Sequence, residues 1–281
     1  MKRVKVFFII SFWGFFAVLK GAFEDWDSSL EGLFLNRCLV ASEKDLQALK
    51  FNPASASNIE NLKIALWTKA LYWGLGIYKE NFSIGYNFKK YGKTAFLVSN
   101  LHAKEEDWDK SYNELNLALY YSNGIAEGMY IGIGLDLYHI TMPRFGSTQT
   151  FGLSFGILYK FYQKWTLGVS LFNLNNPTIK GIKEEYNLPQ SLNAGICFNP
   201  FKNVYSYFSI GKEKYHDIKI SFAQEFSLYK DIFTIETGFS KEEYFKFGAG
   251  FILKIKGFKL GYGIEATKDL PLTHAIGIQF R

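Results

Sequence analysis

One stretch decides the fold of this chain: Trp165-Thr166-Leu167-Gly168-Val169-Ser170-Leu171-Phe172. Large apolar residues alternate along it with threonine, glycine and serine, which is the period of a β-strand with one apolar face. The preceding stretch, residues 151–161, keeps the same alternation, and only residues 162–164 separate the two. We therefore predict a β-hairpin.

The face opposite the large residues favours a membrane barrel over a soluble β-sandwich. A soluble sandwich also alternates, but it turns its large side chains inward and its polar ones outward. Here the opposite face holds mainly Gly152, Ser154, Gly156 and Thr166, with an occasional charge, which suits a crowded or watery lumen. We expect the large side chains to face lipid in a transmembrane antiparallel β-barrel.

The composition agrees with this fold class. Aromatic residues make up 19% of the 281 residues, with 28 Phe and 18 Tyr, while the mean hydropathy of −0.04 excludes a bundle of transmembrane helices. The net charge is +6, but the lysines are scattered rather than gathered in a stripe, so nucleic-acid binding is not expected.

The first 22 residues have the pattern of an export signal. Lys2, Arg3 and Lys5 precede an apolar run from Val6 to Leu19, and Gly21-Ala22 offers a cleavage point. The alternative is a retained N-terminal anchor helix. Two cysteines, Cys38 and Cys197, are compatible with a disulfide, but their separation favours two free thiols.

Residues 23–61 lack sustained alternation and contain the motif Asn52-Pro53-Ala54. An exported chain with an acidic group, Glu43-Lys44-Asp45, shortly before Asn-Pro-Ala resembles the outer-membrane family that includes the fatty-acid transporter FadL and the PorV and PorQ proteins of type IX secretion. The C-terminal residues 258–264 and 270–281, with the pair Thr273-His274, resemble the closing hairpin of its PorV-like branch. The resemblance implies that residues 23–70 form a hatch or plug inside a barrel made by residues 71–281.

Alternating segments predict about 14 wall strands, an even number as in bacterial single-chain barrels. They are residues 71–79, 82–88, 94–102, 112–121, 128–140, 149–161, 164–173, 192–199, 204–210, 218–228, 232–240, 244–255, 258–265 and 272–281. Short connections interleave with long ones, which predicts periplasmic turns at one end and outer loops at the other. The plug would then start below the barrel. Residues 62–66 also alternate, and the count changes by one or two if they belong to the wall.

The parity opposite the apolar one places charged residues in the lumen. These lumen candidates are Asp136, Lys160, Lys219, Glu225, Glu236, Lys246, Lys254, Lys259 and Glu265. Buried charges must be paired, so we interpret them as an ion-pair network that pins the plug or bridges the walls. A selectivity filter is the alternative. Glycine runs such as Gly132-Ile133-Gly134 and Gly248-Ala249-Gly250 suit lumen positions that leave room for the plug.

No motif in the chain indicates catalysis or a cofactor. The four histidines are not in metal-ligand spacing, and neither a nucleophile elbow nor a phosphate loop is convincing. We therefore expect no enzyme activity, no cofactor and no metal. The longest loop, residues 173–191, is the place where a ligand or partner would touch from outside, unless it is only a solvated loop.

Two functions follow from the barrel and the resemblance. The first is passage or delivery of a hydrophobic or small solute across the outer membrane of a diderm bacterium. The second is a secretion accessory resembling PorV or PorQ, which would bind a secreted protein through its outer loops. The expected partners are outer-membrane lipid and either a hydrophobic ligand or secretion-system proteins.

Overall fold

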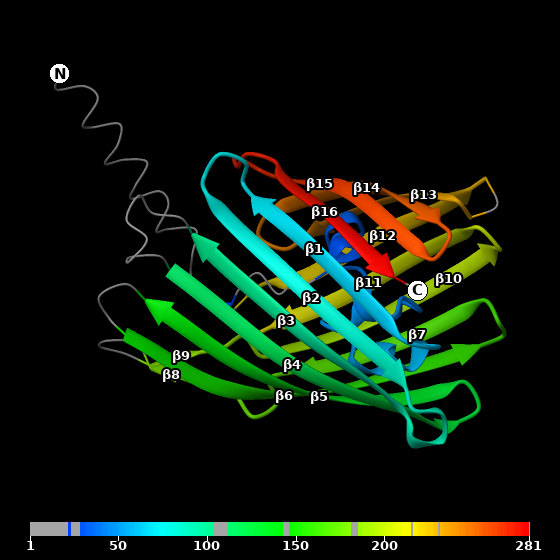
Figure 1. The fold of residues 1–281 in the computed structure, drawn as a ribbon, viewed down its shortest axis with the longest axis horizontal. Coiled ribbons are helices and arrows are strands. Elements are labelled where there is room, and N and C mark those ends of the chain that lie inside the picture. Colours follow the sequence, from blue (N-terminus) through cyan, green and yellow to red (C-terminus); the bar gives the residue numbers. More distant parts are fainter. Residues whose placement is uncertain are drawn as a thin grey trace.

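The computed structural model describes residues 22–23, 29–103, 112–142, 146–180, 185–214, 216–229 and 231–280. The expected leader, residues 1–22, lies outside the described residues except for Ala22. Fourteen strands close into one antiparallel barrel, in which β1 pairs with β16 and β7 pairs with β10 (Figure 1). The predicted fold class and strand number are confirmed.

The wall strands are β1 (Lys63–Leu71), β2 (Ile77–Asn87), β3 (Lys93–Ala103), β4 (Tyr112–Ala126), β5 (Met129–Met142), β6 (Gly146–Phe161), β7 (Trp165–Phe172), β10 (Ser191–Phe201), β11 (Val204–Glu213), β12 (Ile218–Leu228), β13 (Phe233–Lys241), β14 (Phe245–Ile255), β15 (Phe258–Thr267) and β16 (Thr273–Phe280). A separate two-stranded sheet consists of β8 (Thr178–Lys180) and β9 (Glu185–Asn187). The short helices are α2 (Leu30–Phe34), η1 (Leu46–Ala48), η2 (Pro53–Asn58) and η3 (Lys89–Tyr91). Among the described residues, no helix has the length and apolar character to cross a membrane.

Two differences from the predicted strands compensate each other in the count. The expected boundary between plug and wall, residue 70, lies inside β1, so the wall begins at Lys63. The segments 71–79 and 82–88, predicted as two strands, are largely one strand, β2, preceded by a turn. Residues 80 and 81, which separate the two predicted strands, continue the alternation of β2: Glu80 faces out and Asn81 faces the lumen.

The alternation of side chains follows the prediction. Leu167 and Val169 of β7 are each 42% exposed on the outer face, while Thr166 and Ser170 are 3% and 1% exposed on the inner one. In a β-sandwich the large residues would be buried between the sheets, whereas in this barrel they lie on the outer surface. The outer face is therefore apolar, as in transmembrane barrels.

Aromatic side chains gather at the end of the barrel that carries the short turns. Exposed members of this group are Tyr86, Phe88, Tyr91, Tyr121, Tyr159, Tyr162, Phe201, Tyr229 and Phe258. Trp165 and Phe198 stack beside them with ring centroids 4.0 Å apart. A belt of aromatic side chains like this one is typical of the boundary between hydrocarbon and water in transmembrane barrels.

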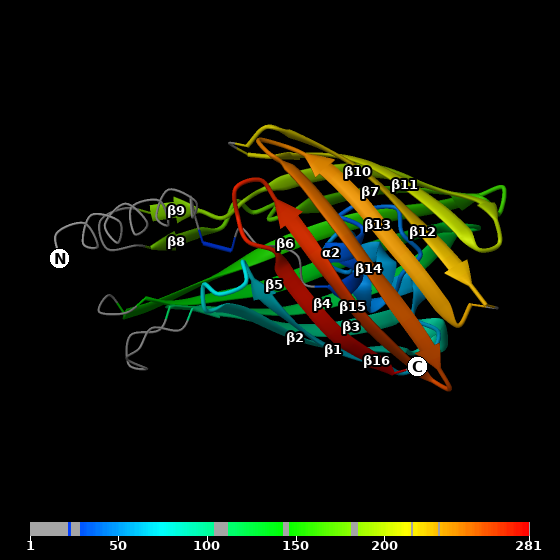
Figure 2. The ribbon, with the colours of Figure 1, turned by 90° about the horizontal axis from the view of Figure 1, so that it is seen from above.

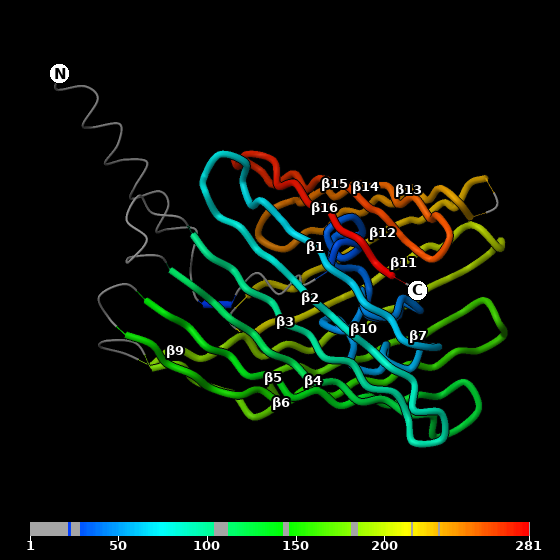
Figure 3. Tube along the Cα trace, in the orientation of Figure 1, coloured from blue at the N-terminus to red at the C-terminus, as the bar shows by residue number. Residues whose placement is uncertain are grey.

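Residues 29–59, here named the inner segment, lie inside the ring of strands (Figures 1 and 2). Before it, Phe23 packs on Tyr138 near the long-loop end, with ring centroids 4.9 Å apart. After it, β1 starts at the short-turn end, where Ile64 pairs with Phe280. Phe23 thus lies near the long-loop end, and the inner segment leads to the short-turn end, where the wall begins (Figure 3). The expectation that this part starts below the barrel is wrong for the described residues.

Candidate functional site

The Asn52-Pro53-Ala54 motif connects the inner segment to strands β5 and β6. The Asn52 side chain is fully buried and accepts a hydrogen bond from the Ala54 amide at 3.0 Å, which caps η2. Its amide nitrogen donates to Val40 O at 2.8 Å and to Ile157 O at 2.9 Å. One side chain thus holds the turn, the preceding part of the inner segment and the wall together.

Glycines in the wall allow the inner segment to approach so closely. A Cβ at Gly132 would lie 2.3 Å from the backbone of Ala54, and one at Gly248 would lie 2.2 Å from Leu33 O. Backbone atoms cannot yield as a flexible side chain can, so these positions require glycine. Similar contacts with the inner segment occur at Gly85, Gly156, Gly168, Gly238, Gly250, Gly261 and Gly263.

A buried ion cluster surrounds Lys44 of the inner segment. Its Nζ lies 2.9 Å from Glu225 Oε2 and 2.7 Å from Glu236 Oε1, and it also pairs with Glu31. Tyr207 donates a hydrogen bond to Glu225 at 3.0 Å. Glu225 and Glu236 are direct partners across the β12–β13 hairpin. Two like charges in that position repel each other, so the lysine from the inner segment is what makes the pair tolerable.

Both charges that the inner segment contributes to this cluster stay ionised. Burial alone would raise the pKa of Glu31, but the attraction of Lys44 and Lys259 outweighs it and lowers the pKa to about 2. Burial alone would lower the pKa of Lys44, but Glu225, Glu236 and Glu31 raise it well above its ordinary value. Glu31 and Lys44 therefore form an ion pair at neutral pH.

A second buried ion pair joins Lys50 of the inner segment to Asp136 of β5. Asp136 is fully buried and also accepts hydrogen bonds from Asn116 and Tyr120, both at 3.3 Å. The two buried lysines of the inner segment thus contact carboxylates on β5, β12 and β13. Because these strands lie on different sides of the barrel, the inner segment is held from more than one direction.

Weaker contacts hold the inner segment near the short-turn end. Lys160 donates to Asn58 at 2.9 Å and lies 3.5 Å from Glu43. Glu43 accepts a hydrogen bond from Thr166 at 3.0 Å, and Lys63 lies 3.5 Å from Asp45. The side chains of Lys160 and Glu43 are 30% and 46% exposed, so their ion pair contributes little stability.

The structure places all nine lumen candidates on the inward-facing parity of their strands. Asp136, Glu225, Glu236, Lys160 and Lys259 contact the inner segment, the last through Glu31 at 3.8 Å. Glu265 is buried on the same face, and Lys219, Lys246 and Lys254 are half-buried there. Sequence reasoning missed the partners Glu31, Lys44 and Lys50. One signal was available, because a hairpin that pairs Glu225 with Glu236 demands a cation from elsewhere.

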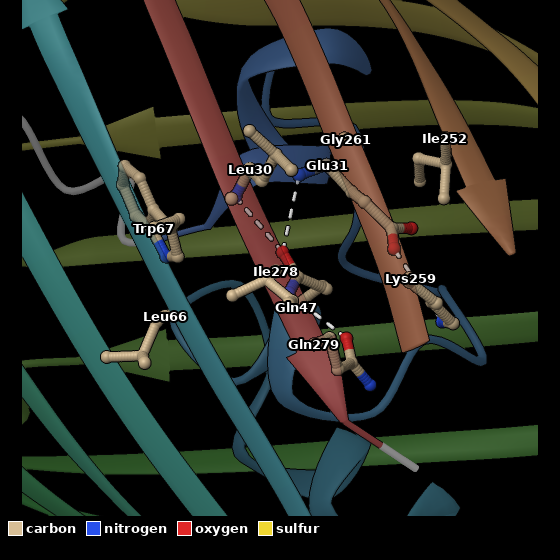
Figure 4. Close-up of a pocket in the computed structure, with 11 residues that line it drawn as sticks. Leu30, Glu31, Gln47, Leu66, Trp67, Ile252, Lys259, Gly261, Ile278 and Gln279 are labelled. Carbon is tan, nitrogen blue, oxygen red and sulfur yellow. Dashed lines mark hydrogen bonds and ion pairs between the residues drawn. The ribbon is translucent and has the colours of Figure 1, made fainter. Parts of the chain in front are cut away.

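A narrow crevice separates the inner segment from the wall at β1, β16 and β15 (Figure 4). Leu30, Glu31 and Gln47 line it from the inner segment, while Trp67 and Lys259 line it from the wall. The wall is thin here, because Gly261 and Gly277 face each other across β15 and β16. The volume of about 10 Å³ has room for about one water molecule and none for an organic solute.

Metal and thiol chemistry find no support in the described residues. Within those ranges, no three His, Cys, Asp or Glu side chains gather as a metal site would require. Cys38 and Cys197 are both buried and free, although they belong to one apolar cluster. The structure thus agrees with the expectation of two free thiols.

Comparisons with known proteins find similarity in the fold but none in the sequence. No protein-family model and no curated protein matches the sequence. Among solved structures, the chain is similar to the CymD monoaromatic hydrocarbon channel, with a TM-score of 0.62 and 10% identity over 92% of this chain and 98% of that one. It is also similar to the Ralstonia pickettii toluene transporter TbuX, with a TM-score of 0.63 and 10% identity over 88% and 97%.

A FadL homologue of Pseudomonas aeruginosa gives the same picture, with a TM-score of 0.64 and 9% identity over 90% of this chain and 98% of that one. The likenesses span nearly the whole of these proteins, so the barrel is similar as a unit and not only in a few strands. At such identities the likeness concerns the fold, and this chain has the FadL-like barrel fold of these channels.

Proposed function

We propose that the protein is an outer-membrane channel for hydrophobic solutes of the size of a monoaromatic hydrocarbon, and that the inner segment is its plug. Three features support this proposal: the apolar outer face, the belt of exposed aromatic side chains at the short-turn end, and the likeness to hydrocarbon channels. On this proposal the protein has no enzymatic role.

One observation carries the proposal: the inner segment fills the lumen, and buried polar contacts join it to the wall between separate apolar clusters. Lys44 and Lys50 are bound by wall carboxylates, and Asn52 is bound by a wall carbonyl. Water can satisfy these groups if the segment shifts and the lumen fills with water, whereas breaking the wall ladders would leave backbone groups unpaired in lipid. A solute would therefore pass when the inner segment moves and the barrel stays closed.

The test is uptake of radiolabelled toluene by cells of a diderm host that lacks its own hydrocarbon channels. Cells that carry the protein should take up toluene several times faster than cells with an empty vector, at equal surface expression. Uptake of a hydrophilic sugar should be the same in both strains, because the inner segment fills the lumen between the strands. Equal toluene rates in the two strains would overturn the proposal.

The solved structures compared above are channels and transporters, so they do not support the other expectation, a secretion accessory resembling PorV or PorQ. Its test is copurification of a large secretion protein with the outer loops intact and its loss when residues 174–190 are removed.

A further inference from the structure

The outer rim of the barrel has one large step. At the long-loop end, neighbouring strands mostly end together, as Ile77 with Ala103 and Lys212 with Ile218. In contrast, β6 starts at Gly146, while β7 pairs with it only from Phe155 onward. β10 begins at the level of the end of β7, so β5 and β6 run past both (Figure 1). Among the described strands, residues 146–154 of β6 thus have no ladder on the side of β7.

Residues 173–180 and 185–190 of the longest loop close this step. We name them the rim loop. It leaves β7 through a tight turn, with positive φ at Asn173 (55°) and Asn176 (48°) and a 2.9 Å hydrogen bond between their backbones. It then forms the β8–β9 sheet, and β8 lies against β6. The rim loop therefore occupies the place of a missing wall strand.

The amide of Asn175 substitutes for the backbone of a strand on the outer side of the step. Its Oδ1 accepts from the Leu153 amide at 2.9 Å, and its Nδ2 donates to Phe151 O at 2.8 Å. Next to it, the Leu174 amide donates to Leu153 O at 2.8 Å. Asn175, Leu153, Phe151 and Leu174 are all exposed, so water can replace these three hydrogen bonds at a small cost in free energy.

Asn173 holds the same step from the inner side. Its side chain is fully buried, accepts a hydrogen bond from the Tyr138 hydroxyl at 3.1 Å and donates to Pro189 O at 2.7 Å. A Cβ at Gly152 would lie 2.1 Å from its Oδ1, so glycine in β6 makes room for it. The inner contact is buried and tight, while the outer contact of Asn175 is exposed and exchangeable.

The step lies where the outer face changes from apolar to polar. Phe151, Leu153 and Leu174 are apolar and exposed, and the next outward residues of β6, Gln149 and Ser147, are polar. Beneath the rim loop, Ile179 and Leu188 are buried against Tyr138 and Ile140. Opening the outer contact would connect an apolar external surface with an apolar interior.

We propose that this step is a side entrance for hydrophobic solutes and that Asn175 is the positioning residue that holds it shut. The proposal rests on the proposed channel function and adds the route by which the solute reaches the lumen. Asn173 acts as the hinge, because it stays anchored when Asn175 releases the edge of β6. The solute then meets Ile179, Leu188 and Ile140 before it reaches the inner segment.

The opening variant is Asn175→Ala, and its matched control is Asn123→Ala, an exposed asparagine that binds backbone at the opposite end of the barrel. Hydrogen exchange of the Leu174 amide reports the closed state without any transport. We expect exchange about tenfold faster in Asn175→Ala, which corresponds to about 1.4 kcal/mol, and no change in the control. Initial toluene uptake should at least double in Asn175→Ala only.

The closing variant carries Leu153→Cys and Leu174→Cys, two exposed positions whose backbones are hydrogen-bonded and therefore close enough for a disulfide. Oxidation should lower toluene uptake at least threefold, and a reductant should restore it, while either single cysteine variant should not respond. If the oxidised double variant takes up toluene at the wild-type rate, the side entrance is wrong although the channel function stands. If the wild type takes up no toluene, the channel function fails, and the side entrance fails with it.

Discussion

At the scale of single residues, charges that are far apart in the sequence depend on one another. Glu225 and Glu236 can be placed in the lumen from local alternation alone, because each sits on the polar parity of its strand. Their partner Lys44 could not be identified in this way, because it precedes the wall and its position depends on a non-local path through the barrel. Local pattern therefore predicts which side chains face inward, but not what they meet.

Replacing Lys44 by methionine should destabilise the protein strongly. The change removes the cation between Glu225 and Glu236, and breaking a buried ion pair in this way costs about 3–5 kcal/mol. Chemical unfolding in lipid vesicles measures the loss, with Lys164→Met, at an exposed turn, as the control. Adding Glu236→Gln to Lys44→Met should recover part of the loss. A Lys44→Met variant as stable as the control would show that the cluster does not hold the inner segment.

Replacing Gly132 by alanine should loosen the plug without opening the barrel. The new Cβ would meet the backbone of Pro53 and Ala54 at 2.3 Å, so the motif must move away from β5. Planar-bilayer recordings should show brief current steps in Gly132→Ala that the wild type lacks. Gly124→Ala is the matched control, because the nearest atom to its Cβ is 3.6 Å away. Silent recordings from both variants would argue against the plug.

At the scale of elements, the sequence was sufficient for strands whose alternation is clean and insufficient where both faces are mixed. β7 was predicted to within one residue at each end, since its apolar and small residues alternate without interruption. β1 falls within the predicted plug because the apolar parity of residues 62–66 does not continue into Leu71. In the structure Trp67, Lys69 and Leu71 share the inward face, so the lumen side of β1 is not small and polar. The segment that forms β2 is predicted as two strands because charged and polar residues interrupt its alternation. In the structure Glu80 lies on the outer face of the wall, 3.2 Å from His102.

The position of β1 leads to a prediction about two deletions that differ by nine residues. Removing residues 23–61 leaves β1 in place, so β16 and β2 remain joined through it and the barrel stays closed. This variant should keep the heat-dependent gel shift of a folded barrel and conduct ions in planar bilayers. Removing residues 23–70 deletes almost all of β1 and leaves two open strand edges in lipid, which is prohibitively costly. It should lose the gel shift, and equal behaviour of the two deletions would contradict the boundary at Lys63.

At the scale of the whole molecule, the choice between lipid and water outside the barrel decides which residues can face the lumen. The lumen can be crowded and charged only because the large apolar residues are on the outer face, where lipid rather than water covers them. The alternation of the sequence predicts the closed barrel, and the barrel is what this chain shares with the hydrocarbon channels. What alternation does not contain is the route of the solute, which depends on the rim step and on the inner segment.

Arginine scanning of the outer face tests the medium directly. Leu135 lies in the middle of β5 and is 48% exposed, whereas Gln149 of β6 faces outward in the polar rim. In a bilayer, Leu135→Arg should lower the free energy of unfolding by about 2–4 kcal/mol, and Gln149→Arg by about 0–1 kcal/mol. Equilibrium unfolding in urea with lipid vesicles gives both values. Because neither side chain contacts the inner segment, a difference between them reports depth in the hydrocarbon and not plug stability; equal losses would mean that the apolar band does not face lipid.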